Sequence, residues 1–565
     1  MRWVSWSTCG FLVLGLLVFA PSCGSSSKSS GFGDDGGGSG SGGSGGGSGN
    51  GGSGGGSGSF GGDDGSSGEG GFVGDPVTCA EASQSQSYIG CDYWPTVTAN
   101  NVWGIFDFAV VVANTGTNPA NITITGPGGT NQTGTVAPQS LSKFYLPWVN
   151  VLKGPDADNC GSAMPLSTSV LARGAAYHLV ASVPVTVYQF SALEYQGMGG
   201  PTGKSWSACP GNSVCQQTLG PIGCYSFSND ASLLLPSTAM TGNYRVTGHG
   251  GWGAAMMGSY MAITATAANT TVAVHVSSTG GVTAGGGITA TAAGGTLMLQ
   301  MGQGDVAELV GASVDASDLS GTLVTANNPV QVITGLPCLD VPDTAPACDH
   351  VEESNLPAET LGKDYIVSQP TGPHGSIVGQ EVRIIGNFDN TQLTYSSQPS
   401  GCPTTINAGQ VVDCGIVAQD FEVKGNNSFA VAIFTQGASV VDPAAQPPSQ
   451  EGDPDESMMV AVPQYRTKYV FLAPTDYQEN YLVVTAPTGA VLGLDGANVT
   501  ATPAPVGATG FGIIRVPLGP GQAGAHVLTS TQPVGIQVMG YGAYTSYQYP
   551  GGLDLVHISP PPMSQ

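Results

Sequence analysis

Basic residues are scarce in this sequence, which has only 13 Lys or Arg among 565 residues, against 38 Asp or Glu. The formal net charge of −25 at pH 7 therefore arises mainly from missing bases. Nucleic-acid partners require clustered cations that neutralise phosphates, so this composition argues against binding to nucleic acid. An acidic, base-poor exterior is instead typical of a surface that keeps a protein soluble.

Other patterns are missing as well. No segment shows a sustained helical apolar period, and the apolar run from Phe11 to Ala20 is too short to span a bilayer. Neither Cys-x-x-Cys nor a pair of His at ligand spacing occurs, which argues against a zinc site. What is abundant is Gly (88) and Pro (39), between short runs rich in Val, Thr, Ala and Tyr. This composition predicts an all-β protein.

One phrase occurs four times, each time as a polar turn followed by a prolyl or apolar residue that opens a strand of period two. Self-similarity at a spacing of roughly one hundred residues predicts four tandem β units of sandwich-like size, although their topology cannot be read from the sequence. If this interpretation is right, Val185, Val330, Val431 and Val534 should occupy equivalent strands. The four copies span residues 182–188, 327–333, 427–433 and 531–538.

A second phrase marks the unit boundaries: an acidic residue, a few apolar residues, a proline, and then an aromatic residue that leads a strand. In the clear copies the aromatic residue is Tyr244, Tyr365 or Tyr469, and Phe106 is a looser fourth. These boundaries divide the chain. The predicted parts are β unit 1 (75–200), a cysteine-bearing insertion (201–227), β unit 2 (228–340), β unit 3 (351–442), a Pro-rich linker (443–454) and β unit 4 (455–558).

The N-terminus resembles a bacterial lipoprotein signal over residues 1–22. Arg2 supplies a positive charge, an apolar run ends at Ala20, and Cys23 follows the cleavage site as the expected lipidated residue. Ala20 stands where such signals usually carry leucine, so simple secretion is the alternative. Residues 23–71 are almost pure Gly and Ser, which predicts a disordered tether with a span of about 40 Å. We therefore expect a bacterial envelope protein, lipid-anchored at the outer membrane or cell surface.

Ten cysteines remain once Cys9 and Cys23 are set aside, and an even number in an exported chain predicts five disulfides. Three pairs are close in sequence and lie in loops or at unit edges. They are Cys79 with Cys91, Cys338 with Cys348, and Cys402 with Cys414. The remaining four allow three connectivities, between which the sequence does not choose: Cys160, Cys209, Cys215 and Cys224.

Acidic residues recur at the unit boundaries. Such carboxylates could hold calcium together with backbone carbonyls, or each could accept backbone N–H bonds in the turn that enters its unit. We favour the second interpretation and expect no cofactor. The acids concerned are Asp230, Glu352, Glu353, Asp453, Asp455 and Glu456.

Four tyrosines alternate with small residues near the C-terminus: Tyr541, Tyr544, Tyr547 and Tyr549. Tyrosine is favoured at interfaces for its rigid amphipathic contact area, so these residues form our tentative binding surface. The alternative is that they pack against a neighbouring unit. The seven histidines are scattered and nominate no catalytic residue, and His178 and His526 occupy similar places in their repeats.

Several long phrases carry a family resemblance, among them Ser228–Pro236, Gly452–Pro454, Pro463–Arg466 and Tyr549–Leu553. They resemble the N-terminal domain family of the IgGFc-binding protein, and the resemblance covers about residues 75–558. It implies an exported, non-enzymatic binding or adhesion domain, and it supplies no ligand residues to carry over.

Two classes of function follow from these observations. The first is a lipid-anchored surface protein that engages an extracellular protein or glycan without catalysis and contacts the membrane only through its lipid. The second is an exported hydrolase acting on extracellular polymer, for which the sequence nominates no catalytic constellation. A passive structural role in the envelope is a further alternative.

Overall fold

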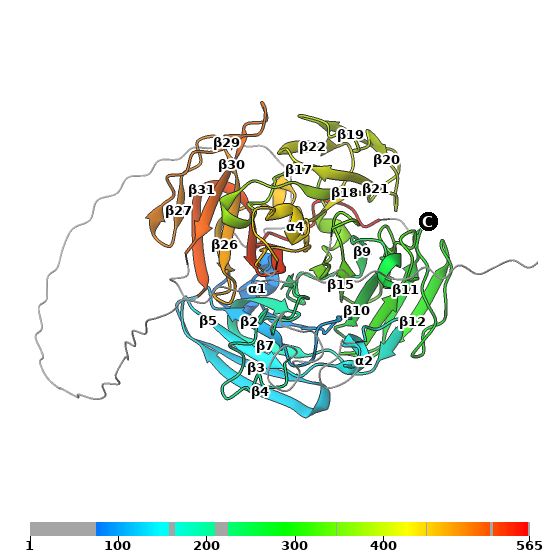
Figure 1. The fold of residues 1–565 in the computed structure, drawn as a ribbon. Helices are drawn as coiled ribbons and strands as arrows, with labels where there is room; N and C mark the ends of the chain where they lie inside the picture. Colours follow the sequence, from blue (N-terminus) through cyan, green and yellow to red (C-terminus); the bar gives the residue numbers. More distant parts are fainter. Residues whose placement is uncertain are drawn as a thin grey trace, which may run out of the picture. The chain divides into compact units, whose positions relative to one another are not determined.

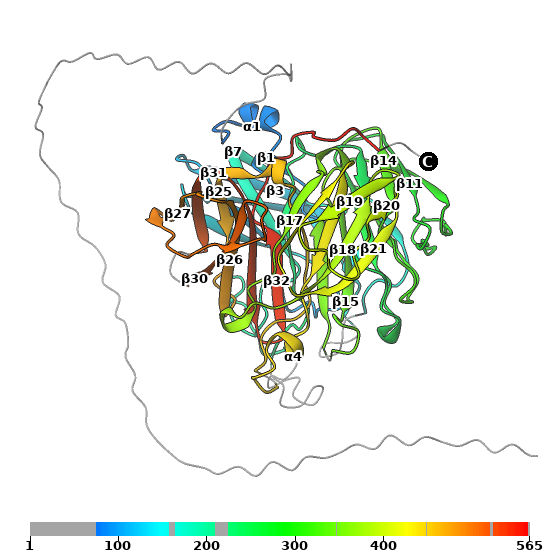
Figure 2. The ribbon, with the colours of Figure 1, turned by 90° about the horizontal axis from the view of Figure 1, so that it is seen from above.

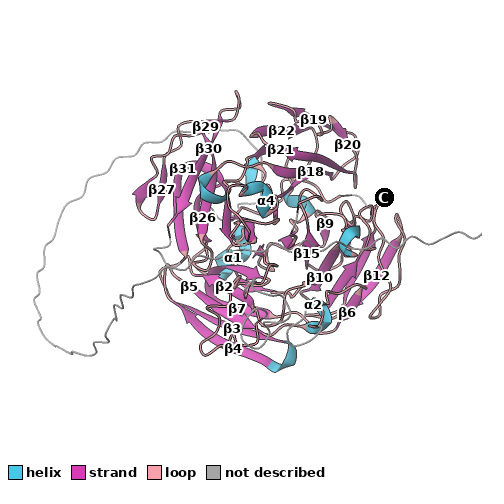
Figure 3. Cartoon of the chain, in the orientation of Figure 1, coloured by secondary structure: helices cyan, strands magenta, loops and turns pink. Residues whose placement is uncertain are grey.

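A computed structural model describes residues 75–156, 164–209, 224–345, 347–447, 449–519 and 524–562. The signal-like segment with Cys23, the Gly/Ser-rich stretch, Cys160 and Cys215 lie outside the described residues. The structure is 45% strand and 7% helix, which confirms the all-β prediction (Figure 3). In the described part of the chain, no helix is both long enough and apolar enough to cross a membrane.

The strands form four successive β-sandwiches, which follow one another around a propeller-like ring (Figure 1). Each sandwich has an inner sheet and an outer sheet. The last strand of each inner sheet along the chain lies at the ring centre, and we call it the closing strand. The strands run largely along the axis of the ring (Figure 2). This arrangement confirms the prediction of four tandem sandwich-like repeats.

The four sandwiches repeat one strand order, with local additions. Sandwich 1 has the inner sheet β8 (Ala231–Leu234), β7 (His178–Phe190), β2 (Phe108–Ala113), β5 (Leu141–Leu146) and the outer sheet β1 (Gly90–Tyr93), β7, β3 (Ala120–Gly126), β4 (Thr130–Val136). The inner sheet of sandwich 2 has the strand order β16 (Asp349–Ser354), β15 (Val330–Leu339), β10 (Tyr260–Ala265), β13 (Val306–Val310), β6 (Val170–Ala172). Its outer sheet has the order β9 (Asn243–Arg245), β14 (Leu323–Ala326), β11 (Thr270–His275), β12 (Thr296–Met301).

Sandwiches 3 and 4 follow the same plan. The inner sheet of sandwich 3 has the strand order β24 (Glu456–Met458), β23 (Phe429–Phe434), β18 (Gln380–Gly386), β21 (Val411–Val417). Its outer sheet has the order β17 (Asp364–Val367), β22 (Phe421–Gly425), β19 (Thr391–Tyr395), β20 (Thr405–Ile406). Sandwich 4 has β32 (Thr545–Pro550), β31 (Ala525–Gly542), β26 (Glu479–Pro487), β30 (Phe511–Leu518), β29 (Ala504–Pro505) and the outer sheet β25 (Arg466–Leu472), β31, β27 (Leu492–Leu494), β28 (Ala497–Asn498).

Helices are short and lie in the connections between strands. The α-helices among the described residues are α1 (Cys79–Ser85), α2 (Asn150–Lys153) and α4 (Ala438–Val441). The 3₁₀ turns are η1 (Pro127–Gly129), η3 (Gly253–Ala255), η4 (Ala358–Thr360), η5 (Pro373–Gly375) and η6 (Val462–Gln464).

Burial separates the two kinds of sheet. Every residue of the inner strands β2, β10 and β18 is buried, because one face of each inner sheet packs on its outer sheet and the other on neighbouring sandwiches. The outer strands β3, β12 and β19 alternate buried with exposed residues, as strands with one solvated face do. The near-continuous apolar runs and the alternating runs in the sequence thus correspond to the two layers.

The first repeated phrase lies where the chain crosses from the outer to the inner sheet. In sandwiches 1 and 4 one long strand makes the crossing, and in sandwiches 2 and 3 a break separates β14 from β15 and β22 from β23. Val185, Val330, Val431 and Val534 all lie in these crossing strands, as predicted, although Phe429 is the exact counterpart of the other three valines.

A buried tyrosine holds each crossing in place. Its hydroxyl donates a hydrogen bond to the carbonyl of a residue at the crossing, and the tyrosine lies in the first strand of the outer sheet. The four bonds run from Tyr93 to Val185 (2.7 Å), Tyr244 to Val330 (2.6 Å), Tyr365 to Phe429 (2.7 Å) and Tyr469 to Val534. The fourth aromatic counterpart is therefore Tyr93 and not Phe106 as expected from the sequence.

The boundary phrase also behaves differently from expectation. The strands β8, β16 and β24, which we assigned to the start of units 2, 3 and 4, pair with β7, β15 and β23 of the preceding sandwich. The chain therefore closes each inner sheet before it enters the next sandwich. Around the ring centre each of the four closing strands packs against two others, in the order β8, β16, β24, β32.

All three predicted disulfides are present. Cys79–Cys91, Cys338–Cys348 and Cys402–Cys414 have Cα–Cα distances of 5.7, 5.1 and 4.5 Å. The structure adds Cys209–Cys224, with Cα atoms 5.6 Å apart, which the sequence left open.

Candidate functional site

Seven carboxyl groups lie buried on or beside the closing strands, where the four sandwiches meet. Each of these residues is at most 1% exposed. The group includes all six acids that the sequence singled out, and Asp349 is an addition. They are Asp230, Asp349, Glu352, Glu353, Asp453, Asp455 and Glu456.

Asp230 joins three sandwiches through backbone hydrogen bonds. Its Oδ2 accepts the N–H of Glu352 on β16 at 2.9 Å and the N–H of Glu456 on β24 at 3.1 Å. Asp349 acts similarly, because its Oδ1 accepts the N–H of Asn229 at 2.6 Å and that of His350 at 2.7 Å. Asp230 is thus a backbone N–H acceptor, as we favoured, but it reaches across sandwiches and not only within a local turn, and Asp349, which the sequence did not single out, does the same.

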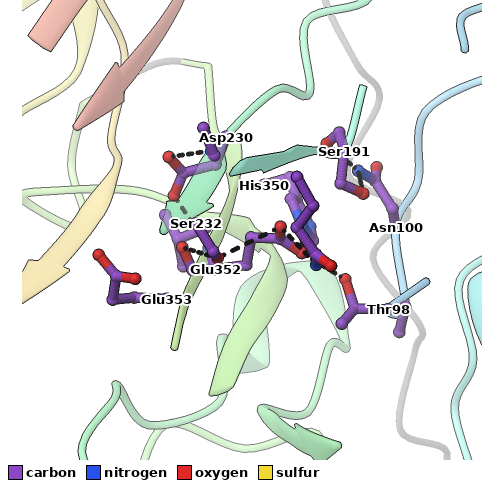
Figure 4. Close-up of polar contacts among 12 residues, drawn as sticks. Thr98, Asn100, Ser191, Asp230, Ser232, His350, Glu352 and Glu353 are labelled. Carbon is purple, nitrogen blue, oxygen red and sulfur yellow. Dashed lines mark hydrogen bonds and ion pairs between the residues drawn. The ribbon is translucent and has the colours of Figure 1, made fainter. Parts of the chain in front are cut away.

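Glu352 is held by side chains (Figure 4). Thr98 donates its hydroxyl hydrogen to Oε2 at 2.7 Å, and the Gln189 amide donates to Oε1 at 3.0 Å. His350 Nε2 lies 3.4 Å from Oε2. Glu353, its neighbour on β16, points to the opposite face of the strand, where its Oε1 accepts the N–H of Ser354 at 2.7 Å.

The electrostatics of this centre favour protonated carboxyls. Burial raises the pKa of Glu353 and Glu456 well above the usual range, and that of Asp455 to about 7. Burial, followed by the Asp455 charge, raises the pKa of Asp230. No described Lys or Arg forms an ion pair with any of the seven acids, and neither carboxylate oxygen of Glu456 has a hydrogen-bond partner. The centre therefore stabilises the fold best when Asp230, Glu353, Asp455 and Glu456 are neutral.

The central acids do not converge as calcium ligands. Among the described residues, a single group of three His, Cys, Asp or Glu side chains brings its ligand atoms within 4.8 Å of one another. That group is His374, Glu451 and Glu479, which lies outside the set that the sequence singled out. The sequence could not indicate it, since its members are up to 105 residues apart.

The tentative tyrosine surface is wrong for three of its four members. Tyr541, on β31, is 1% exposed, and Tyr547 and Tyr549 are fully buried because β32 is the closing strand of sandwich 4. Tyr549 packs against Tyr188 of sandwich 1, with ring centroids 4.9 Å apart, so the alternative of packing on a neighbouring unit is correct. Tyr544 is partly exposed and donates a hydrogen bond to Gln450 at 2.9 Å.

The histidines form no catalytic triad in the described part of the chain. His178 contacts Asp92 at 2.7 Å and stacks on Trp94, and His526 contacts Asp495 at 2.8 Å and stacks on Phe471. Equivalent histidines thus make equivalent contacts, as expected of repeat structure. Among the described residues, His275 is the histidine whose ring contacts a Ser or Thr hydroxyl. Its Nδ1 lies 3.1 Å from the Thr296 hydroxyl oxygen, and none of these residues places a carboxylate against it.

A groove lies between sandwiches 2 and 3. It consists of two adjoining hollows of about 660 and 370 Å³, which share the lining residues Asp315, Asp318, Arg383 and Asp413. The Arg383 guanidinium donates to Asp318 at 2.5 Å and to the Gly248 carbonyl. Burial opposes ionisation of Asp318, but the adjacent guanidinium outweighs it and lowers the carboxyl pKa. This ion pair joins the two sandwiches at the base of the groove.

The walls of the groove are polar and preorganised. One lining segment, from Asn407 to Asp413, lies inside the loop closed by Cys402–Cys414, and Leu339, Pro342 and Asp343 lie inside the loop closed by Cys338–Cys348. A buried arginine, Arg245, also lines it, with Nε and Nη2 unpartnered. Exposed hydroxyl and amide groups complete the lining: Ser278, Thr279, Thr296, Asn407 and Gln410. Sequence analysis missed this groove because its residues come from widely separated segments.

Comparison with known proteins gives one match. A family model described as IgGFc binding protein matches residues 230–540, which is more than half of the 565-residue chain. The match begins at the acid that joins three sandwiches and includes every residue that lines the groove. No curated protein and no solved structure matches the chain.

Proposed function

The chain belongs to the IgGFc-binding family, and from that premise we propose that it is an exported protein that binds an extracellular protein or glycan without turning it over. The observation that carries the proposal is the groove between sandwiches 2 and 3. The larger of its two hollows has a volume of about 660 Å³ and is open to solvent along exposed polar side chains.

The groove suits binding because its walls are fixed before a partner arrives. Two disulfide-closed loops form part of its lining, and the Arg383–Asp318 ion pair holds the sandwiches together beneath it. Preorganised loops lose less conformational entropy on association, so more of the contact energy appears as affinity. The hydroxyl and amide groups of Thr279, Asn407 and Gln410 offer hydrogen bonds to sugar hydroxyls or to a peptide backbone.

The absence of turnover is supported by the contacts of the groove histidines. His249 pairs with Glu381 at 3.2 Å, and His275 contacts Thr296 but no carboxylate among the described residues. Hydrolysis would require a nucleophile or water positioned by a base that is itself oriented by a third group. Neither histidine has both neighbours.

Anchoring through Cys23 completes the proposal. A lipid at that residue and a Gly/Ser-rich tether of about 40 Å would place the sandwiches away from the bilayer, within reach of partners outside the cell. The lipoprotein-like signal supports an outer-membrane or cell-surface location.

The proposal is tested by screening the full chain on a glycan array and a panel of purified extracellular proteins, beside a broad hydrolase screen. A bound partner is then titrated against Thr279→Trp and Asn407→Trp, which fill the groove, and against Thr133→Trp, an exposed control on β4 of sandwich 1. We expect groove variants to bind at least about tenfold more weakly, a loss of 1.4 kcal/mol, while the control is unchanged. Turnover of any substrate, or equal binding by all variants, would overturn the proposal.

A further inference from the structure

A cluster of one imidazole and three carboxylates lies between sandwiches 3 and 4. His374 is in η5, between β17 and β18 of sandwich 3, and Glu479 begins β26 of sandwich 4. Asp442 and Glu451 lie after α4, on the segment between β23 and β24 of sandwich 3. Three separate parts of the chain thus contribute to one cluster.

The distances are those of a metal site before closure. His374 Nδ1 lies 3.0 Å from Glu479 Oε1, and His374 Nε2 lies 3.6 Å from Asp442 Oδ2. Ligand atoms of His374, Glu451 and Glu479 all lie within 4.8 Å of one another. Two atoms bound tetrahedrally at about 2.1 Å from one ion are about 3.4 Å apart, so small side-chain movements would complete the site.

The cluster carries more negative than positive groups. In the described part of the chain, none of its three carboxylates forms an ion pair with Lys or Arg, and His374 is the one cationic group that pairs with them. Glu451 Oε2 is shielded from solvent and accepts no hydrogen bond. A dication would supply a partner for this oxygen.

The support around the cluster fixes its ligands. Glu479 Oε2 accepts the backbone N–H of His374 at 2.6 Å and the hydroxyl of Tyr481 at 2.7 Å, and Asp442 Oδ2 accepts the backbone N–H of Glu451 at 3.0 Å. Asp442 is 3% exposed, whereas the His374 side chain is 56% exposed, so an ion can enter from solvent. In metal sites, the groups that hydrogen-bond to the ligating residues usually fix the orientation of those ligands.

We propose that His374, Glu451 and Glu479 bind a divalent transition-metal ion that clamps sandwich 3 to sandwich 4, while Asp442, beside the other imidazole nitrogen, orients the ring. One nitrogen with carboxylate oxygens suits Zn²⁺ or Mn²⁺, whereas Ca²⁺ prefers oxygen ligands alone. The site is structural, because His374 and Glu451 belong to sandwich 3 whereas Glu479 belongs to sandwich 4.

The test is titration of Zn²⁺, Mn²⁺ and Ca²⁺ into the untagged full chain after treatment with a chelator. Calorimetry should show one Zn²⁺ per chain, bound more tightly than Ca²⁺. Affinity should fall at least about a hundredfold in His374→Ala and in Glu451→Gln. The control His557→Ala removes an exposed imidazole outside the groove that forms no ion pair with the described residues, and it should bind Zn²⁺ like the wild type.

A further readout separates a clamp from surface binding. Zn²⁺ should raise the unfolding midpoint of the wild type and of His557→Ala, but not that of His374→Ala, because the ion binds only the folded arrangement. Unchanged binding in His374→Ala, preference for Ca²⁺, or no saturable binding would overturn the proposal.

Discussion

The protonation of the ring centre can be tested by replacing Asp455 with asparagine. This carboxyl is fully buried, and its Oδ2 accepts a hydrogen bond from Ser546 at 2.7 Å while its Oδ1 has no partner. The groups that face it are the Asp230 and Asp453 carboxyls and the Tyr541 and Tyr547 phenols, none of which is cationic. Asparagine keeps the acceptor for Ser546 and carries no charge at any pH.

The sign and size of the change in stability with pH follow from the pKa shift of Asp455. Burial raises the pKa of Asp455 from 3.8 in the unfolded chain to about 7 in the fold, so folding takes up a proton between these values. Stability contributed by the group is complete below the unfolded pKa and is lost as pH rises through the folded pKa. Between pH 5 and pH 7 the folded state holds the proton and the unfolded chain does not. These two pH units correspond to a loss of unfolding free energy of at most about 2.7 kcal/mol by pH 8.

The assay is the free energy of unfolding in denaturant at pH 5 and pH 8. Wild type should lose stability over this interval, and Asp455→Asn should lose up to about 2.7 kcal/mol less. Asp389→Asn makes the same chemical change at an exposed position and should leave the pH dependence unaltered. If Asp455→Asn were instead less stable than the wild type at pH 8, a positive partner would be holding the ionised carboxylate of the wild type. The neutral-centre account would then fail.

Three other predictions concern different parts of the chain. Tyr365→Phe removes the buried hydrogen bond to Phe429 and should cost about 1 kcal/mol of unfolding free energy, whereas Tyr544→Phe, at a partly exposed position, should cost less. Opening the groove loop by Cys402→Ser with Cys414→Ser should destabilise the protein by up to about 3 kcal/mol and weaken partner binding, and full retention of affinity would refute the role given to that loop. Cys23→Ala should abolish fatty-acid labelling and release the protein from membranes, and labelled Cys23→Ala protein would place the anchor elsewhere.

The repeat architecture was predictable because it is written in short local phrases. A turn residue followed by Pro184, Pro329 or Pro533 marks the point where the chain passes between sheets, and period-two runs mark the strands. Pairing partners were not predictable in the same way. The strand after Asp230 adjoins sandwich 2 in sequence, yet it completes a sheet of sandwich 1. Which sheet a strand joins is decided by long-range packing, which leaves no local signal.

The same limit explains the errors at the candidate sites. An alternation such as that around Tyr547 and Tyr549 places side chains on two faces of a strand, but it does not say whether another sandwich covers each face. The acids were correctly singled out by their recurrence, although their partners lie in other sandwiches. Arg383 with Asp318, and His374 with Glu479, form only when distant segments meet, so neither pair could be found from spacing.

Hydrogen–deuterium exchange of the full chain, with and without its bound partner, tests the central claim most directly. The account predicts that the partner protects the disulfide-closed loops 338–348 and 402–414 and the segment 275–279, while β3 and β4 on the outside of sandwich 1 exchange as before. Protection confined to other surfaces, with exchange in these three segments unchanged, would contradict the claim that the groove between sandwiches 2 and 3 is the binding site.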